Sequence, residues 1–367
     1  MTTEQTVYGT IIYGPEMDII EGCIVIRDGI IKEVSEEKNN SKNIIAPCFI
    51  NAHTHIGDSV LKDPKLGECI DYHVKRDLNA LVKPPDGLKH RVLNKAPYHE
   101  LVEAMEHSIQ DMIMTGTGAF ADFREGGLQG VLALEEAVDG LGIECIKLGR
   151  PRNPSVNNDV LHREIEQVLG RAEGIGMSGA NDVDLQILKQ IRTYTMEEKK
   201  RFAIHAGEND RSDIQGALSL EPDMLIHLAK AQEGDLKDIA DQDIPVVVCP
   251  RSNFITGAGM APVREMLKAG IRVAVGTDNV MLNSVSMFSE MEILSKVFGL
   301  EDRQVFIMCT LMGAAVLGLN TSGSILEKNQ AKVMILNGNS HNLAGVRNPI
   351  SSIVRRGRPD DILSIII

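Results

Sequence analysis

Four short segments of the sequence carry residues that could bind a metal ion and move protons, and each follows an apolar, β-branched run. The segments are "APCFINAHTHIGDS", "RFAIHAGEND", "DMLIHLAKA" and "RVAVGTDNV", and the residues are His53, His55, His205, Glu208, His227, Asp278 and Asn279. A metal-dependent hydrolase needs several neutral imidazoles and a carboxylate that converge from separate strands. One His-x-His pair is a weak indication, whereas four such segments in order favour a single metal site.

His53 and His55 stand two residues apart in an apolar run. Both side chains therefore point to the same side of an extended chain, where they could bind one ion. The alternative is two unrelated polar residues at the end of a strand, and for this pair alone the two interpretations are about equally good. The other three segments favour metal binding.

The remaining candidates could complete the ligand set or carry protons. Glu208 follows His205 by three residues, where a carboxyl group can face the same pocket without binding the metal. Otherwise it is a solvated loop residue or an acid at a helix N-terminus. A lone histidine such as His227 is more often a buried core residue. Asp278 could cap a helix, yet beside three imidazoles it is suited to be an anionic ligand or a base.

Eight apolar runs in the middle of the chain could form the strands that position these residues. They are "CFINAHTH", "GAFADFRE", "IECIKLGR", "EGIGMSG", "RFAIHAGE", "MLIHLAK", "IPVVVCPRSN" and "IRVAVGTDN", and helix-like stretches at 98–114, 130–140, 158–171 and 260–269 lie between several of them. This alternation predicts a (β/α)8 TIM barrel over 48–325, with catalytic groups at the C-terminal ends of the strands. The long, charged segment 56–97 is a candidate lid.

Both ends of the chain contain short β runs instead. The N-terminal runs are "TVYGTIIYG", "GCIVIRDG" and "IIKEVSE", with an Asp-Gly hairpin signal, and the C-terminal ones are "AKVMILNG", "SSIVRRGRPD" and "ILSIII". We therefore predict an α/β protein in which 1–47 plus 326–367 form a small β-sandwich domain beside the barrel.

Composition and charge exclude several other classes of protein. The chain has 367 residues, of which 43% are apolar, and it can bury a large core. A net charge of -13 argues against nucleic acid or an anionic membrane as partner. The N-terminus lacks the pattern of a secretion signal, and no apolar run approaches the roughly 20 residues that span a bilayer. We expect a cytoplasmic protein that acts on a small molecule and can form a homo-oligomer.

The six cysteines are scattered singly, without the Cys-x-x-Cys spacing of a zinc ribbon or the pattern of a disulfide framework. We therefore expect buried thiols. Cys249-Pro250 is similar to part of the motif of the small zinc nucleobase deaminases, but the second cysteine of that motif is missing. This excludes that other deaminase fold.

Taken together, the motifs resemble the amidohydrolase superfamily, in its cytosine deaminase, adenosine deaminase and chlorohydrolase-like (ATZ/TRZ-type) branch. The resemblance covers nearly the whole chain and rests on "PCFINAHTH", "HAGE", "CPRSN", "GTDN" and "GSILEKNQAKVMIL". Two features depart from the family pattern. Cys48 stands where relatives commonly have glycine, and the chain lacks tryptophan, whereas many relatives have a Trp-bearing lid. The elements that cover the substrate are therefore expected to differ from those of such relatives.

The resemblance implies a role for each site residue. One divalent ion, zinc in the first place and iron or manganese as alternatives, would be bound by His53, His55, His205 and Asp278. Glu208 would protonate a ring nitrogen of the substrate, and His227 would orient the attacking hydroxide and stabilise the developing alkoxide. Asp278 would also pass the proton of the water to the leaving group. A divalent ion lowers the pKa of its water from 15.7 to about 7, so hydroxide is available at neutral pH.

The number of metal ions depends on the fourth strand, because dinuclear members of the superfamily carry a carboxylated lysine there. The predicted fourth strand, "EGIGMSG", has no lysine, which favours one ion. Lys147 on the predicted third strand would allow a second ion if the strand count were shifted by one.

Weaker candidates for substrate contacts also stand near strand ends, and they are Arg124, Arg150, Ser252 and Asn253. An arginine there suits a carboxylate or a phosphate of the substrate. The alternative is that each arginine pairs with one of the many acidic residues of the chain.

These observations predict a metal-dependent hydrolytic deaminase of an amino-substituted heterocycle that is similar to a purine nucleoside, a nucleobase or a pterin. The use of Glu208 as a ring-protonating acid makes sense only where the substrate has a ring nitrogen. One alternative is an amidohydrolase or chlorohydrolase that cleaves another C–N or C–Cl bond with the same site. Another is a catalytically inactive barrel that acts as a binding protein, which the complete ligand set disfavours.

Overall fold

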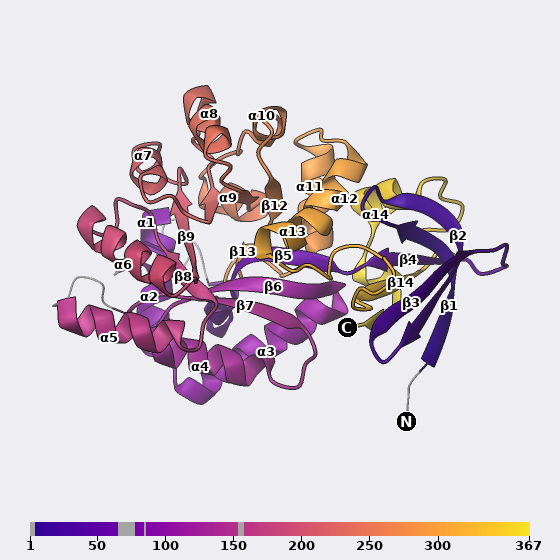
Figure 1. The fold of residues 1–367 in the computed structure, drawn as a ribbon, viewed down its shortest axis with the longest axis horizontal. Helices are drawn as coiled ribbons and strands as arrows, with labels where there is room; N and C mark the ends of the chain where they lie inside the picture. The colour runs from indigo at the N-terminus through magenta and orange to yellow at the C-terminus, as the bar shows by residue number, and fades with distance from the viewer. Residues whose placement is uncertain (1–3, 65–77, 84–85, 153–157) are drawn as a thin grey trace.

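A closed parallel barrel forms the larger part of the molecule in the computed structural model, which describes residues 4–64, 78–83, 86–152 and 158–367 (Figure 1). Its strands are β5 (Phe49–His55), β6 (Thr117–Arg124), β7 (Glu144–Gly149), β8 (Gly174–Met177), β9 (Arg201–Ala206), β10 (Met224–His227), β11 (Val246–Val248), β12 (Val273–Val275) and β13 (Asp278–Asn279). Only Gly276 and Thr277 separate β12 from β13. Because β12 pairs with β11 and β13 pairs with β5, this interrupted last strand closes the ring. The eight predicted strands and the barrel are confirmed.

Amphipathic helices surround the barrel strands (Figure 1). They are α3 (Tyr98–Met114), α4 (Gly127–Val138), α5 (Asn158–Leu169), α6 (Leu185–Glu197), α7 (Ile214–Leu218), α8 (Glu233–Asp241), α9 (Pro250–Thr256), α10 (Val263–Lys268), α11 (Met287–Lys296), α12 (Asp302–Met308) and α13 (Leu311–Leu317). In α3, Val102, Met105, Ile109 and Met112 recur at helical spacing and bury one face against Phe120 of β6. The helix predicted over 98–114 is therefore confirmed with these bounds.

Alternation along the strands separates the interior of the barrel from the layer beneath the helices. On β6, Ala119, Ala121 and Phe123 belong to the interior cluster, whereas Phe120 packs under α3. Leu317 of α13 joins the same interior cluster. A packed interior leaves the C-terminal ends of the strands as the place for a site.

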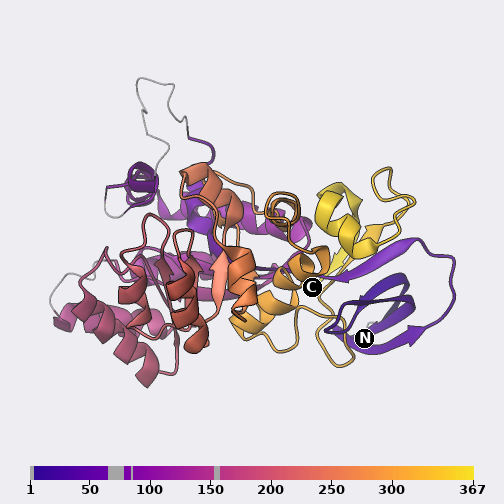
Figure 2. The same cartoon turned by 90° about the horizontal axis from the view of Figure 1, so that it is seen from above.

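A second, six-stranded mixed sheet is built from both ends of the chain, as expected (Figure 2). It contains β1 (Glu4–Tyr13), β2 (Asp18–Arg27), β3 (Ile30–Glu36), β4 (Asn43–Pro47), β14 (Val333–Asn337) and β15 (Ile362–Ile366). The two ends of the chain meet where β14 pairs antiparallel with β4. Cys48 alone separates β4 from β5, so this sheet adjoins the strand that carries the first two histidines.

One predicted strand is wrong. The segment "SSIVRRGRPD" begins inside a helix, α14 (Pro349–Arg356). The Asn348 side chain accepts a hydrogen bond from the Ser351 amide at 3.0 Å, and Pro349 occupies the first turn, where its missing N–H does no harm. Ile350 and Ile353 are buried, and α14 packs on α11 and α12 of the barrel.

The candidate lid, 56–97, begins with a short 3-10 helix, η1 (Ile56–Val60), and contains α1 (Leu78–Leu81) and α2 (Leu88–Leu93). Residues 65–77 and 84–85 of this expectation lie outside the described part of the chain. Among the helices in the described ranges, none is long and apolar enough to cross a membrane.

Candidate metal centre

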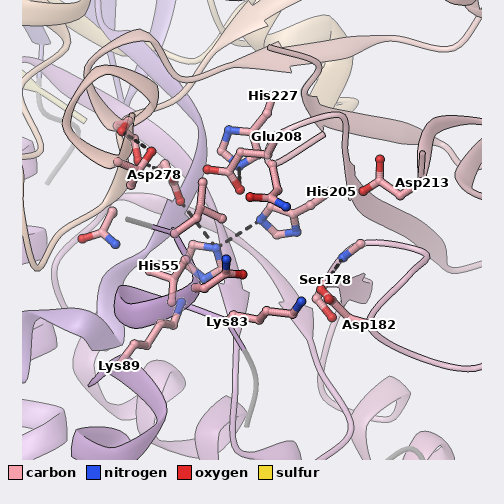
Figure 3. A pocket seen from close by; sticks show the side chains of 18 of the residues that line it. His55, Lys83, Lys89, Ser178, Asp182, His205, Glu208, Asp213, His227 and Asp278 are labelled. Carbon is pink, nitrogen blue, oxygen red and sulfur yellow. Dashed lines mark hydrogen bonds and ion pairs between the residues drawn. The ribbon is translucent and has the colours of Figure 1, made fainter. Parts of the chain in front are cut away.

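Five of the predicted residues meet at the C-terminal ends of four barrel strands. All of them except His53 line one pocket (Figure 3). His53 and His55 lie on β5, His205 on β9, His227 on β10 and Asp278 on β13. Three overlapping groups have ligand atoms within 4.8 Å of one another, and they are His53–His205–His227, His53–His55–Asp278 and Glu208–His227–Asp278. The barrel therefore brings together residues that are far apart in the sequence.

The donor atoms of this group suit a metal ion better than they suit one another. The Nε2 atom of His53 lies 3.3 Å from Asp278 Oδ1, and His55 Nε2 lies 3.5 Å from the same oxygen and 3.3 Å from His205 Nε2. Both ring nitrogens of His53 are buried without a hydrogen-bond partner among the described residues. Buried polar atoms normally have partners, so unpartnered imidazole nitrogens beside a carboxylate fit a divalent cation.

Burial also keeps these histidines in the neutral form that a metal requires. Burial lowers the pKa of His53, lowers that of His55 to about 3, and lowers that of His205 well below its ordinary value. A neutral imidazole has a lone pair to offer, whereas an imidazolium does not. The structure thus contains a buried histidine–aspartate site for a metal.

Neighbouring strands fix the orientation of the rings. His205 Nδ1 donates to the Met177 carbonyl of β8 at 2.7 Å, so its Nε2 faces the pocket. His55 Nδ1 lies 3.1 Å from the Phe123 carbonyl of β6 and 3.0 Å from Glu125 Oε1. Such partners determine which nitrogen of each ring carries the proton.

The backbone of the site is strained at two functional residues. His227 has φ 76° and Asp278 has φ 56°, both in the left-handed region that side chains rarely adopt. Next to Asp278, a Cβ on Gly276 would lie 2.7 Å from the His53 Cβ. Glycine at this position therefore permits the close approach of β5 to the interrupted last strand.

Glu208 and Asp278 line the same pocket, and their pKa values are shifted in opposite directions. Burial raises the pKa of Glu208 to about 7, and Glu208 Oε2 lies 3.4 Å from His227 Nε2. Burial also opposes the charge of Asp278, but the contact with His53 at 3.3 Å and the other surrounding histidines outweigh it and hold the pKa of Asp278 well below its ordinary value. Two carboxyl groups with separated pKa values can act as an acid and a base.

A pocket of about 200 Å³ opens above the site (Figure 3). Its charged lining includes the cations Lys83, Lys89 and Arg150 and the carboxylates Asp182, Asp210 and Asp213. Lys83 and Lys89 come from the candidate lid, which therefore contributes to the wall of the pocket. Sequence reasoning missed both lysines, and the charged character of 56–97 was the only signal that pointed to them.

The four weaker candidates lie in different places. Arg150 lines the pocket, and its Nε donates to the Gly176 carbonyl at 3.2 Å. Ser252 also lines the pocket and donates to Asp278 Oδ2 at 2.5 Å. Asn253 Oδ1 accepts from His227 Nδ1 at 2.9 Å. Arg124 is outside the lining formed by the described residues, and it is buried in ion pairs with acidic neighbours.

Asn279 and Lys147 differ in their position relative to the pocket. Asn279 lines the pocket, and its Oδ1 accepts from the Leu282 amide at 3.0 Å. Lys147 lies on the third barrel strand, as predicted, where its Nζ bonds to Glu135 at 2.9 Å and lies outside the described lining of the pocket. The fourth strand, β8, contains no lysine.

Comparisons with known proteins agree with this geometry. The amidohydrolase family matches residues 44–367. The chain is 34% identical to a Methanothermobacter thermautotrophicus protein provisionally named an aminohydrolase, over 98% of this chain and 96% of that one. It is 25% identical to the 5'-deoxyadenosine deaminase of Methanococcoides burtonii, over 96% and 88% of the two chains. It is also 25% identical to the 5-methylthioadenosine/S-adenosylhomocysteine deaminase of Thermococcus onnurineus, over 98% and 91%.

Solved structures share the fold at lower identity. A zinc-bound adenosine deaminase from Xanthomonas campestris has a TM-score of 0.80 at 16% identity, covering 99% of this chain and 91% of that one. The atrazine chlorohydrolase TrzN from Arthrobacter aurescens TC1, complexed with zinc, has a TM-score of 0.82 at 16% identity, covering 99% and 93%. With the family match over most of the chain, these findings show that this protein is a hydrolase of the amidohydrolase family.

Proposed function

We propose that this protein is a metal-dependent deaminase of an amino-substituted heterocycle, with adenine nucleosides as the first substrates to test. The observation that carries the proposal is Glu208, a carboxyl group with its pKa raised to about 7 that faces the same pocket as the metal-binding group. A proton donor of this kind is useful where a ring nitrogen must be protonated before an amino group leaves. The deaminase relatives named above support adenine nucleosides as the substrate class.

The proposed ligands of one divalent ion are His53, His55, His205 and Asp278. Zinc is the first candidate because the adenosine deaminase of the same fold binds it, and iron or manganese would suit the same donors. When bound, the ion supplies a water whose pKa is lowered to about 7. The absence of a lysine from β8 supports a single ion.

The other residues of the site move and hold protons. Glu208 donates its proton to a ring nitrogen, so that the carbon bearing the amino group accepts the attacking oxygen. His227 keeps its Nδ1 proton on Asn253, which leaves Nε2 as an acceptor that orients the attacking water. Asp278, held ionised and aligned by Ser252, takes the proton of the water and passes it to the leaving amine. Location in the cytoplasm and assembly into a homo-oligomer stay predictions from the sequence.

Ammonia release across a panel of purine nucleosides, nucleobases and pterins tests this proposal. The protein is first loaded with zinc and its metal content is measured, so that an empty site cannot explain a negative result. We expect ammonia from at least one adenine nucleoside. No ammonia from any member of the panel, with metal bound, would contradict the deaminase proposal. Chloride or amine release from triazines in the same assay would instead support the alternative leaving groups.

A further inference from the structure

Six charged side chains lie together behind His55, where β5, β6 and β7 end beneath α2. This charged cluster contains the cations Lys89, Arg124 and Arg150 and the carboxylates Asp58, Asp122 and Glu125. Lys89 is 5% exposed and Glu125 is 9% exposed, although both residue types are rarely buried. Such burial requires that each charge be paired, and it makes the cluster a fixed part of the structure.

Glu125 is the centre of the charged cluster. Its Oε1 lies 2.7 Å from Lys89 Nζ and 3.6 Å from an Arg150 nitrogen, and its Oε2 accepts from Arg124 at 2.8 Å. The same Oε1 lies 3.0 Å from His55 Nδ1. One carboxylate therefore touches both a proposed metal ligand and a lysine of the element that borders the pocket.

The charges of the cluster argue against a role in binding an anionic substrate. Each of the three cations already lies within 3.6 Å of a carboxylate of the cluster, so none of them is left to pair with an anionic substrate. Lys89 already lies between Glu125 and Asp58, with its Nζ 3.3 Å from Asp58 Oδ2. The position of Lys89 is instead suited to hold Glu125 against His55.

A carboxylate at the outer nitrogen of a ligating histidine has a known physical effect. It keeps the proton on Nδ1, fixes the plane of the ring and makes Nε2 a stronger donor to a cation. Nδ1 of His55 hydrogen-bonds to the Phe123 carbonyl and also lies 3.0 Å from Glu125 Oε1, whereas Nδ1 of His205 has the Met177 carbonyl alone among its described partners. His55 is therefore the ligand whose strength depends on a charged neighbour.

We propose that Glu125 is a positioning residue for the metal ligand His55, and that Lys89 holds Glu125 in place from α2. The inference rests on the proposed metal ligands but not on the proposed substrate. It connects the wall of the pocket to the metal, because Lys89 belongs to α2 and also lines the pocket. Displacement of α2 would withdraw Lys89 from Glu125 and loosen the ring of His55.

Zinc affinity, measured on the full-length protein by competition with a chromophoric chelator and without substrate, tests the proposal. We expect Glu125→Gln to weaken zinc binding about 10- to 100-fold, as is usual when an outer partner of a metal ligand is removed. Lys89→Met should weaken it by a smaller factor. The double variant should be no weaker than Glu125→Gln alone, because Lys89 acts through Glu125.

The matched control is Lys147→Met. This change also breaks a lysine–glutamate pair, with Lys147 Nζ 2.9 Å from Glu135 Oε1, but the pair touches no proposed ligand. Its zinc affinity should equal that of the parent. Equal losses in Lys147→Met and Lys89→Met would overturn the proposal, since they would reflect general destabilisation. Parent-like zinc affinity in both Glu125→Gln and Lys89→Met would overturn it as well.

Folding of each variant is checked by circular dichroism. If Glu125→Gln does not fold, Lys89→Met decides, because Glu125 then keeps Arg124 and Arg150 as partners. The visible absorption of its cobalt-substituted form should differ from the parent, and an identical spectrum with unchanged zinc affinity would reject the proposal. Failure of the proposed function can be distinguished from failure of this inference. A parent that binds zinc but deaminates nothing leaves this inference standing, whereas a parent that binds no metal removes the ligand set itself.

Discussion

Replacement of Glu208 by glutamine separates the proposed proton donor from a metal ligand. The two side chains have nearly the same shape, so Glu208→Gln removes the proton without opening a cavity. The distinction is needed because Glu208, His227 and Asp278 also lie within 4.8 Å of one another and could hold an ion as a group. If Glu208 is an acid, the metal stays and turnover is lost. If it is a ligand, metal and turnover are lost together.

The size of the loss follows from the protonation state of Glu208. Burial raises its pKa to about 7, so roughly half of the molecules carry the proton at neutral pH, where a general acid is most effective. Positioned acids contribute about 10²- to 10⁴-fold to a rate. The variant should therefore lose about 2.7 to 5.5 kcal/mol of transition-state stabilisation, at about 1.36 kcal/mol for each tenfold change.

The assay is kcat/KM for ammonia release, measured with metal content by mass spectrometry on the same samples. A rate within threefold or so of the parent, which is well below the general-acid contribution, would refute the role of Glu208. Loss of metal would show that Glu208 belongs to the ligand set, and that the assignment of Asp278 as the carboxylate ligand is incomplete.

Three further predictions concern the same pocket. His205→Ala should lose metal and activity together, and a full complement of metal in that variant would show that the ligand set is wrong. Because protonated Glu208 is the active form and burial raises its pKa to about 7, kcat/KM should fall with rising pH on the alkaline side of this value. A continued rise there would contradict the mechanism. Asn253→Ala frees Nδ1 of His227, and kcat should fall about tenfold with KM and metal content unchanged, whereas an unchanged kcat would remove Asn253 from the positioning of His227.

Local periodicity explains why so much of the fold could be predicted from the sequence. The strand β6 alternates between the interior and the helix layer, and α3 repeats its apolar residues at helical spacing, so both patterns are visible in short windows. The segment of α14 is too short for this test, since "SSIVRR" suits a strand as well as a helix. Its capping signals, Asn348 and Pro349, were the better indication.

The site residues that could be predicted are those that stand at the end of an apolar run. His53, His205, His227 and Asp278 all do so, and the barrel brings the ends of its strands together. The partnership of Lys89 with Glu125 could not be predicted, because it depends on where α2 packs in the folded chain. The role of Arg124 could not be predicted either. It depends on burial beside Asp122, and burial is a property of the tertiary structure.

The left-handed backbone at His227 and Asp278 has a consequence for the evolution of the protein. A residue held in this conformation costs about 1 to 3 kcal/mol, a sizeable part of the stability of an ordinary domain. Glycine would relieve that cost at either position but would delete the side chain on which the reaction depends. Selection for catalysis therefore maintains a less stable protein than selection for folding alone would produce. In a lineage that had lost its substrate, these two positions would be among the first to drift toward glycine or asparagine.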